Sequence, residues 1–191
     1  ITAIGVITLI IATIGATFAY FSSTSSTKEE SIKTGSLKLD ATSSELTSAN
    51  IKPTTWNDVM ASNVANEDIA QLKLSVDTYG TTIEDAKYNI YLTTTGIAHN
   101  SNNRLEGGIL KDIKWKLVNS NNEVINTGDF SKVDYSKPIK LTKSPITIEK
   151  KDTKEEATQT FLLFIYIDNK GQENQLQDLI INGTLSAKAV Q

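Results

Sequence analysis

The sequence predicts a mainly β protein, an antiparallel β-sandwich that follows one long hydrophobic α-helix. Residues 1–21 are predominantly apolar and carry no charge, and the first charged residue is Lys28. From Gly35 onward, apolar and polar residues alternate in many short runs with no helical segments between them. Such runs are typical of antiparallel sheets packed in two layers. We therefore expect two parts, a hydrophobic helix at residues 1–27 and a β head domain at residues 28–191.

The apolar stretch has the length of a helix that crosses a lipid bilayer, which is about 20 residues. In a soluble protein, a helix that is apolar all round has to be buried on every side. The remainder of this 191-residue chain is too polar and too small to surround it. The stretch is therefore expected either in lipid or packed against copies of itself.

Two features favour packing between copies. The sequence starts directly at the apolar core, and a cut before that core is typical of prepilin-type peptidases, whereas an ordinary signal peptidase cuts after it. Small residues also recur four positions apart, where they open grooves for a neighbouring helix. A plain membrane anchor or a signal peptide remains the alternative. The expected helix-packing residues are Gly5, Ala12, Gly15, Ala16 and Ala19.

Composition narrows the function classes. The net charge is −3 and both signs are mixed along the chain, so no basic cluster suggests a nucleic-acid partner. The chain has no Cys, which excludes disulfides, thiolate metal sites and cysteine catalysis. The abundance of Thr, Ser, Asn and Ile behind an apolar segment favours an extracellular or cell-surface protein.

In the first half of the head domain, the strands are predicted by alternation of apolar residues. Leu37 and Leu39 share one face of the first, at residues 35–42. Residues 43–66, interrupted by Pro53, are expected to be a long connection with a helical turn near 57–61. Further strands are expected at residues 70–77 and 87–95, and a polar loop at residues 95–108.

The second half opens with the clearest hairpin, two strands at residues 112–119 and 123–130 around the turn Ser-Asn-Asn. Pro138 and Pro145 each open a short strand, because proline suits a first strand position or a sheet edge. The run Phe161–Ile165 is continuously apolar, as in a strand covered on both faces, either by the core's other layer or by a neighbouring subunit. After a turn, the strand at residues 178–190 closes the chain.

Several stretches together resemble the camelysin/TasA-like secreted fibre proteins. They are FAYFSSTSS followed by KTGSLKLDAT, the hairpin KWKLVNSNNEVINTGDF, and FIYIDN with NGTLSAKAVQ. The resemblance implies a jelly-roll or immunoglobulin-like sandwich that assembles into extracellular fibres. It also implies that a donor segment, here residues 22–39 with Leu37 and Leu39, completes the sheet of the next subunit. Such proteins normally lose the apolar segment, here by a cut after Ala19.

The apolar stretch itself resembles the N-terminal helix of type IV pilins in position and character. Bacterial type IV pilins usually carry Glu at the fifth mature position, where this chain has Gly5. This departure fits the archaeal pilins and archaellins better. The two resemblances together describe a pilin-like helix joined to a TasA-like head.

No motif predicts catalysis, a cofactor or a metal. The single histidine, His99, lies in the expected Asn-rich loop, and the HExxH, P-loop, GxGxxG and GxSxG patterns are missing. Asp168, Asn169 and Gly171 loosely resemble a calcium loop but lack its spacing, so a hairpin turn is expected there. An enzyme is therefore not expected.

Two surface features remain. Asn182-Gly183-Thr184 is an N-glycosylation sequon, although it falls within a predicted strand. Trp56, Trp115 and the tyrosines could form a sugar-binding face, but aromatic residues at alternating strand positions are more often core.

These observations predict a structural subunit of an extracellular filament, a pilin that polymerises through its hydrophobic helix. The subunit would bind other copies of itself, and before assembly it would lie in the membrane. Surface glycans or neighbouring cells are further candidate partners. One alternative is a TasA-like matrix fibre joined by donor strands after removal of residues 1–19. Another is a monomeric, membrane-anchored surface protein, either an adhesin or an enzyme. The missing catalytic motifs argue against the enzyme.

Overall fold

The computed structural model describes most of the head domain and shows a mainly β fold made of two antiparallel sheets. It describes residues 37, 39–44, 46–48, 51–61, 69–82, 85–99, 105, 107–149, 151–168, 176 and 179–190. The predicted helix at residues 1–27, with its five packing residues, lies outside this set. The mainly β, antiparallel prediction is confirmed.

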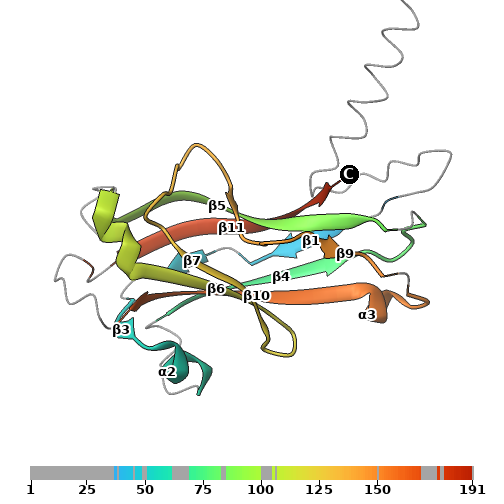
Figure 1. Cartoon of the computed structure of the whole chain (residues 1–191), viewed down its shortest axis with the longest axis horizontal. Helices are drawn as coiled ribbons and strands as arrows, with labels where there is room; N and C mark the ends of the chain where they lie inside the picture. The colour runs from blue at the N-terminus through green and yellow to red at the C-terminus, as the bar shows by residue number, and fades with distance from the viewer. Residues whose placement is uncertain are drawn as a thin grey trace, which may run out of the picture.

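The larger sheet has six strands and the smaller has five (Figure 1). In spatial order, the larger holds β1 (Asp40–Ser43), β4 (Ala70–Asp77), β10 (Thr158–Asp168), β6 (Ile113–Asn119) and β7 (Val124–Asp129). Its sixth strand, β3 (Pro53–Thr54), runs parallel to the end of β10. The smaller sheet holds β2 (Leu46–Ser48), β11 (Leu179–Val190), β5 (Lys87–His99) and β8 (Ile139–Lys140), and β9 (Ile146–Thr147) also pairs with β5.

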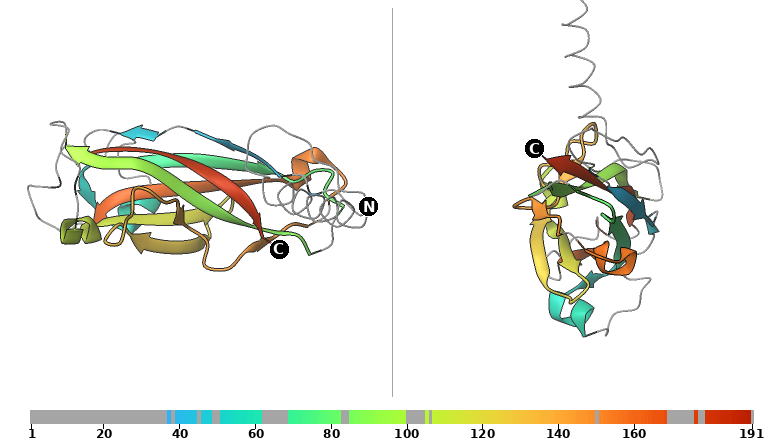
Figure 2. Two further views of the ribbon diagram at one scale, coloured as in Figure 1. Left: turned by 90° about the horizontal axis from the view of Figure 1, so that it is seen from above. Right: turned by 90° about the vertical axis from the view of Figure 1, so that its right-hand side faces the viewer.

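The two sheets lie one above the other, with β5 and β11 in one layer and β4, β10 and β6 in the other (Figure 1). Figure 2 shows that the strands run along the length of the domain. Inward residues alternate along each strand, as Leu72, Leu74 and Val76 of β4 show, each with no exposed surface. They join one core cluster that also contains inward residues of β5, β6, β10 and β11.

Tyr88 links the two layers. Its hydroxyl, on β5, donates a hydrogen bond to Oε1 of Gln159 on β10. Its ring packs edge-on against Phe161, with the ring centroids 6.4 Å apart. Burial raises the pKa of Tyr88, because the charged phenolate would lose its hydration inside the core. The tyrosine therefore acts as a neutral donor in the core.

In the part of the chain that the structure describes, three short helical segments accompany the sheets: α2 (Trp56–Met60), α3 (Lys154–Ala157) and the 3₁₀ helix η1 (Gly107–Asp112). Thr55 caps α2, since its side chain accepts a hydrogen bond from the backbone N–H of Asp58 at 3.3 Å. Thr153 caps α3 in the same way, accepting from Glu156. The expected helical turn near residues 57–61 is thus confirmed, whereas α3 and η1 were not predicted.

Several predicted boundaries are wrong. The first strand begins at Asp40, so Leu37 and Leu39 precede it. The expected connection at residues 43–66 contains β2 and β3. Strand β5 continues to His99, which was expected in a loop, because Leu179 and the residues after it pair with the end of β5.

The connection after Asp168 is not a hairpin turn. Strand β10 lies in the six-stranded sheet and β11 in the five-stranded sheet, so the chain passes from one layer to the other between them. The hairpin at residues 112–130 is confirmed, as β6 and β7 pair around a turn closed by Asn119. The N–H of Asn119 donates to the carbonyl oxygen of Glu123 at 3.0 Å, and Asn122 adopts the positive φ of 61° that asparagine tolerates.

Gly128 is required by the packing of β7 on Trp115. A Cβ atom at position 128 would lie 2.5 Å from Cζ2 of the Trp115 ring. We therefore expect Gly128→Ala to lower the free energy of unfolding by about 1–3 kcal/mol, since the buried indole cannot shift freely. Urea unfolding measures this. Gly108→Ala is the matched control, because no atom lies within 4 Å of its new Cβ; equal stability of the two variants would contradict the packing argument.

Candidate functional site

The first described segment of the domain belongs to both sheets. We call residues 39–44 and 46–48 together the crossing strand. Its first half, β1, pairs with β4 in the six-stranded sheet, from Asp40 opposite Asp77 to Ser43 opposite Leu74. Its second half, β2, pairs with β11 in the five-stranded sheet, where Leu46 lies opposite Gly183. The crossing strand therefore forms an edge of each sheet and joins the two layers.

Two serines hold the crossing strand where it passes between the sheets. The hydroxyl of Ser43 accepts a hydrogen bond from the backbone N–H of Leu185 on β11, at 2.9 Å. Ser44 pairs with Lys73 on β4, since its N–H donates to the Lys73 carbonyl and its hydroxyl accepts from the Lys73 N–H. Side-chain hydroxyls thus satisfy amides of both sheets at the point where strand pairing changes partner.

The two residues predicted for a donor strand lie next to this segment. Leu39 is 7% exposed and belongs to the main core cluster. Leu37 is half-buried and packs against the same cluster. The structure therefore places both leucines against the core of their own chain, at the start of the crossing strand.

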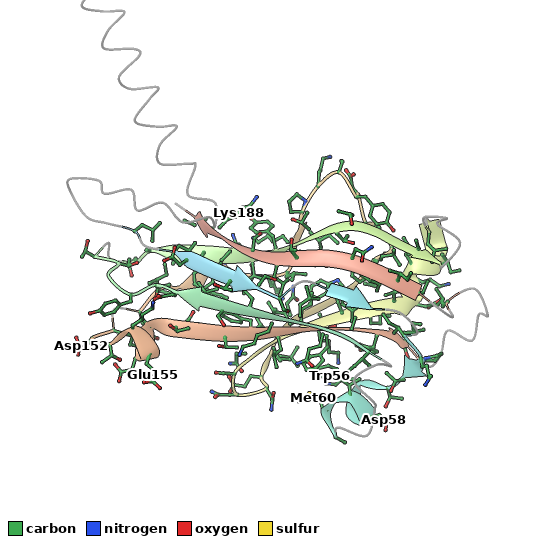
Figure 3. All side chains as sticks on the ribbon, turned by 180° about the vertical axis from the view of Figure 1, so that it is seen from behind. Trp56, Asp58, Met60, Asp152, Glu155 and Lys188 are labelled. Atoms are coloured by element: carbon green, nitrogen blue, oxygen red, sulfur yellow. The ribbon has the colours of Figure 1, made fainter. Side chains whose placement is uncertain are left out.

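A second candidate surface is the aromatic cluster formed by α2 on the outer side of the six-stranded sheet (Figure 3). Trp56 packs edge-on against Phe164 at 5.7 Å and lies 6.1 Å from the ring of Tyr166. Nζ of Lys116 sits 4.2 Å from the centroid of the Trp56 ring. Burial lowers the pKa of Lys116, because it disfavours the charged ammonium.

This cluster bears on two predictions. Of the outward residues of β10, Phe164 in the predicted apolar run is half-buried and Tyr166 just after it is buried, and both pack against α2 of their own chain. Cover of this face by a neighbouring subunit stays a prediction. As a sugar platform, Trp56 is disfavoured because Lys116 already lies over its ring. Trp115 is 5% exposed and belongs to the core, as expected for an aromatic residue at an alternating position.

No relative guides the assignment. Comparison with protein-family models, with curated proteins and with solved structures found no match to this chain. Within the described residues, no group of three or more His, Asp or Glu side chains is placed to hold a metal ion. Of the helices in those same ranges, none is both long and apolar enough to cross a membrane.

The predicted glycosylation sequon lies on β11 with its acceptor side chain exposed. Asn182 stands at a β-bulge, and its carbonyl oxygen accepts a hydrogen bond from the Thr94 hydroxyl at 2.7 Å. Thr184 is also exposed and lies opposite Thr93 of β5. Asn182 is exposed, and its modification stays a prediction.

Sequence reasoning missed the serines of the crossing strand. Ser43 and Ser44 interrupt the alternation of apolar and polar residues. That interruption is the local sign of a strand that changes sheets. Their partners, Leu185 and Lys73, lie 142 and 29 residues away, so no local pattern could identify them. The remaining predicted positions, Gly5, Ala12, Gly15, Ala16 and Ala19, lie outside the described residues.

The burial of the two leucines generates one prediction. Leu39→Ala should lower the free energy of unfolding by about 2–4 kcal/mol, because it removes a buried side chain and leaves a cavity. Leu37→Ala, at a half-buried position, should cost less than about 1.5 kcal/mol. Chemical denaturation of the full chain measures both, and a larger loss at Leu37 would contradict the arrangement.

The aromatic cluster leads to a second prediction about stability. Trp56→Ala should destabilise the protein by about 1–3 kcal/mol, since it removes two ring contacts and the Lys116 interaction. It should also speed amide hydrogen exchange in α2. Met60→Ala, at a position 36% exposed on the same helix, should change stability by less than about 0.5 kcal/mol. If both variants behaved alike, α2 would not depend on Trp56.

Proposed function

We propose that this chain is a structural, non-enzymatic subunit of an extracellular filament. The observation that carries the proposal is the uncharged apolar stretch at residues 1–21 ahead of a β domain with a large core of its own. The proposed division is a helix at residues 1–27 and a head at residues 28–191. The proposed head is an antiparallel sandwich of the jelly-roll or immunoglobulin-like type.

In the proposed mechanism, the helix is stored in the membrane before assembly and then packs against helices of other copies. Gly5, Ala12, Gly15, Ala16 and Ala19 would allow the close approach of neighbouring helices. Burial of apolar surface, at about 25 cal/mol per Å², would be the main driving term. Contacts that repeat head to tail without closing would let the polymer grow.

The direction of the chain in the head supports this arrangement. Asp40 pairs with Asp77, and Val190 pairs with Lys87, so the start of β1 and the end of β11 lie at one end of the domain. That end also carries α3 and β9 (Figure 1). The strands of the described head therefore begin and end at the same end of the domain, which suits a head displayed on the outside of a helical core.

A second candidate is a matrix fibre joined by donor strands after removal of residues 1–19. The crossing strand favours it, because this strand is an edge of both sheets and its partners are remote in sequence. Its serines bond to residues 29 and 142 positions away. The same segment of another copy could make the same hydrogen bonds, as in strand addition.

Ala16→Arg separates the two candidates. An arginine in the apolar stretch should abolish helix-cored filaments, because a charge cannot be buried there without a partner. Ala61→Arg, at an exposed position of the head, is the control and should leave filaments intact. Negative-stain electron microscopy of material sheared from cells measures filaments, and thermal unfolding checks the head.

Normal filaments from Ala16→Arg would exclude the helix-cored arrangement. Mass spectrometry of the native N-terminus then assigns the result. A chain that begins at Ile1 supports the helix-cored filament, and one that begins near Tyr20 supports the strand-linked fibre. A retained leader sequence would indicate a membrane anchor and oppose both.

A further inference from the structure

Strand β7 is the most open edge of the two sheets. Among the edge strands that the described residues form, β7 is the longest, at six residues, and it pairs only with β6. The other edges are shorter or interrupted: β1 and β2 belong to the crossing strand, β3 contains Pro53, and β8 and β9 have two residues each. An open edge offers unpaired backbone donors and acceptors to another strand.

The side chains of β7 do not protect this edge. From Val124 to Gly128 the strand carries no charge and no proline, which are the usual devices against edge pairing. Val124 is 47% exposed, the most exposed large apolar residue described. The ion pair between Asp129 and Lys114, with Nζ and Oδ2 3.5 Å apart, lies at the far end of the strand.

We propose that β7 pairs with β7 of a second copy of this chain, antiparallel and about a two-fold axis. An uncharged strand can approach its own copy without repulsion, and a two-fold contact is self-complementary. An axis on Asn126 would set Asp129 opposite Glu123 of the second copy, which is unfavourable. An axis on Thr127 avoids this and sets the two Thr127 side chains opposite each other, a favourable cross-strand pair.

The contact is too small to hold two isolated subunits together. Six residues from each copy bury far less than the roughly 1,200 Å² of a stable interface. In a filament, many such edges act together and the effective concentration rises to about the millimolar range. The proposed contact therefore joins filaments side by side. This bundling rests on the proposed filament function, whereas the pairing of β7 edges does not.

Because the chain has no Cys, one introduced cysteine reports the contact cleanly. Directly opposed strand residues lie within disulfide range. Thr127→Cys in the full chain should form interchain disulfides at least about tenfold faster than Thr93→Cys. Thr93 is equally an exposed strand threonine, but it lies in the other sheet, on β5, where it pairs with Thr184 of β11. Equal rates over a range of protein concentrations would overturn the proposal.

Charge at the edge provides the second test. Thr127→Lys sets two ammonium groups opposite each other and should convert bundled filaments into single ones, measured as bundle width by electron microscopy. Val124→Lys should act the same way, and it removes no hydrogen bond among the described contacts. Thr93→Lys should leave the bundles unchanged. Bundles that persist in both β7 variants would overturn the proposal.

The two tests separate the two ideas. If the wild-type chain forms no filaments, the proposed function fails. The rate of cysteine cross-linking in the solubilised full chain at high protein concentration still decides the edge pairing, because a disulfide traps even a short-lived contact between two copies. If filaments form and Thr127→Cys links no faster than Thr93→Cys, the edge pairing fails and the filament function stands.

Discussion

The arrangement of this domain depends on one constraint: the first strand has to satisfy two sheets at once. A strand that leaves one sheet for another leaves backbone groups of both sheets without a strand partner at the crossing. The hydroxyls of Ser43 and Ser44 replace that partner, since they accept hydrogen bonds from the N–H of Leu185 in one sheet and of Lys73 in the other. The crossing strand can therefore pass from one sheet to the other while Leu39, at its start, stays buried in the core.

The alternation of apolar and polar residues predicted most strands, because one face of each sheet is buried and the other is not. It succeeded for β4, β6 and β11, where inward apolar residues occur at every second position, whereas β7 was predicted as the second strand of a hairpin. It failed after Asp168, because a turn sequence does not indicate whether the next strand joins the same sheet. It also ended β5 too early, since pairing with β11 extends that strand through polar residues.

The candidate site was predictable only in part, for a related reason. The alternation predicted that Leu39 faces the core, and it is buried there; its role in a donor strand stays a prediction. The cover over Phe164 and Tyr166 was not predicted, because Trp56 reaches them from a different part of the chain. Lys116 completes that cluster from a third segment, strand β6. Contacts assembled from three remote segments leave no pattern in any single stretch.

The molecule presents two apolar features of very different strength. The stretch at residues 1–21 is long enough that covering its side chains is worth about 1.5–3 kcal/mol for each large one. The β7 edge exposes one large apolar side chain and a short backbone ladder, worth roughly 1 kcal/mol per hydrogen bond at best. The proposed contacts therefore form a hierarchy. The apolar stretch would drive formation of the polymer, and the edge, too weak alone, would act only where the polymer presents many copies together.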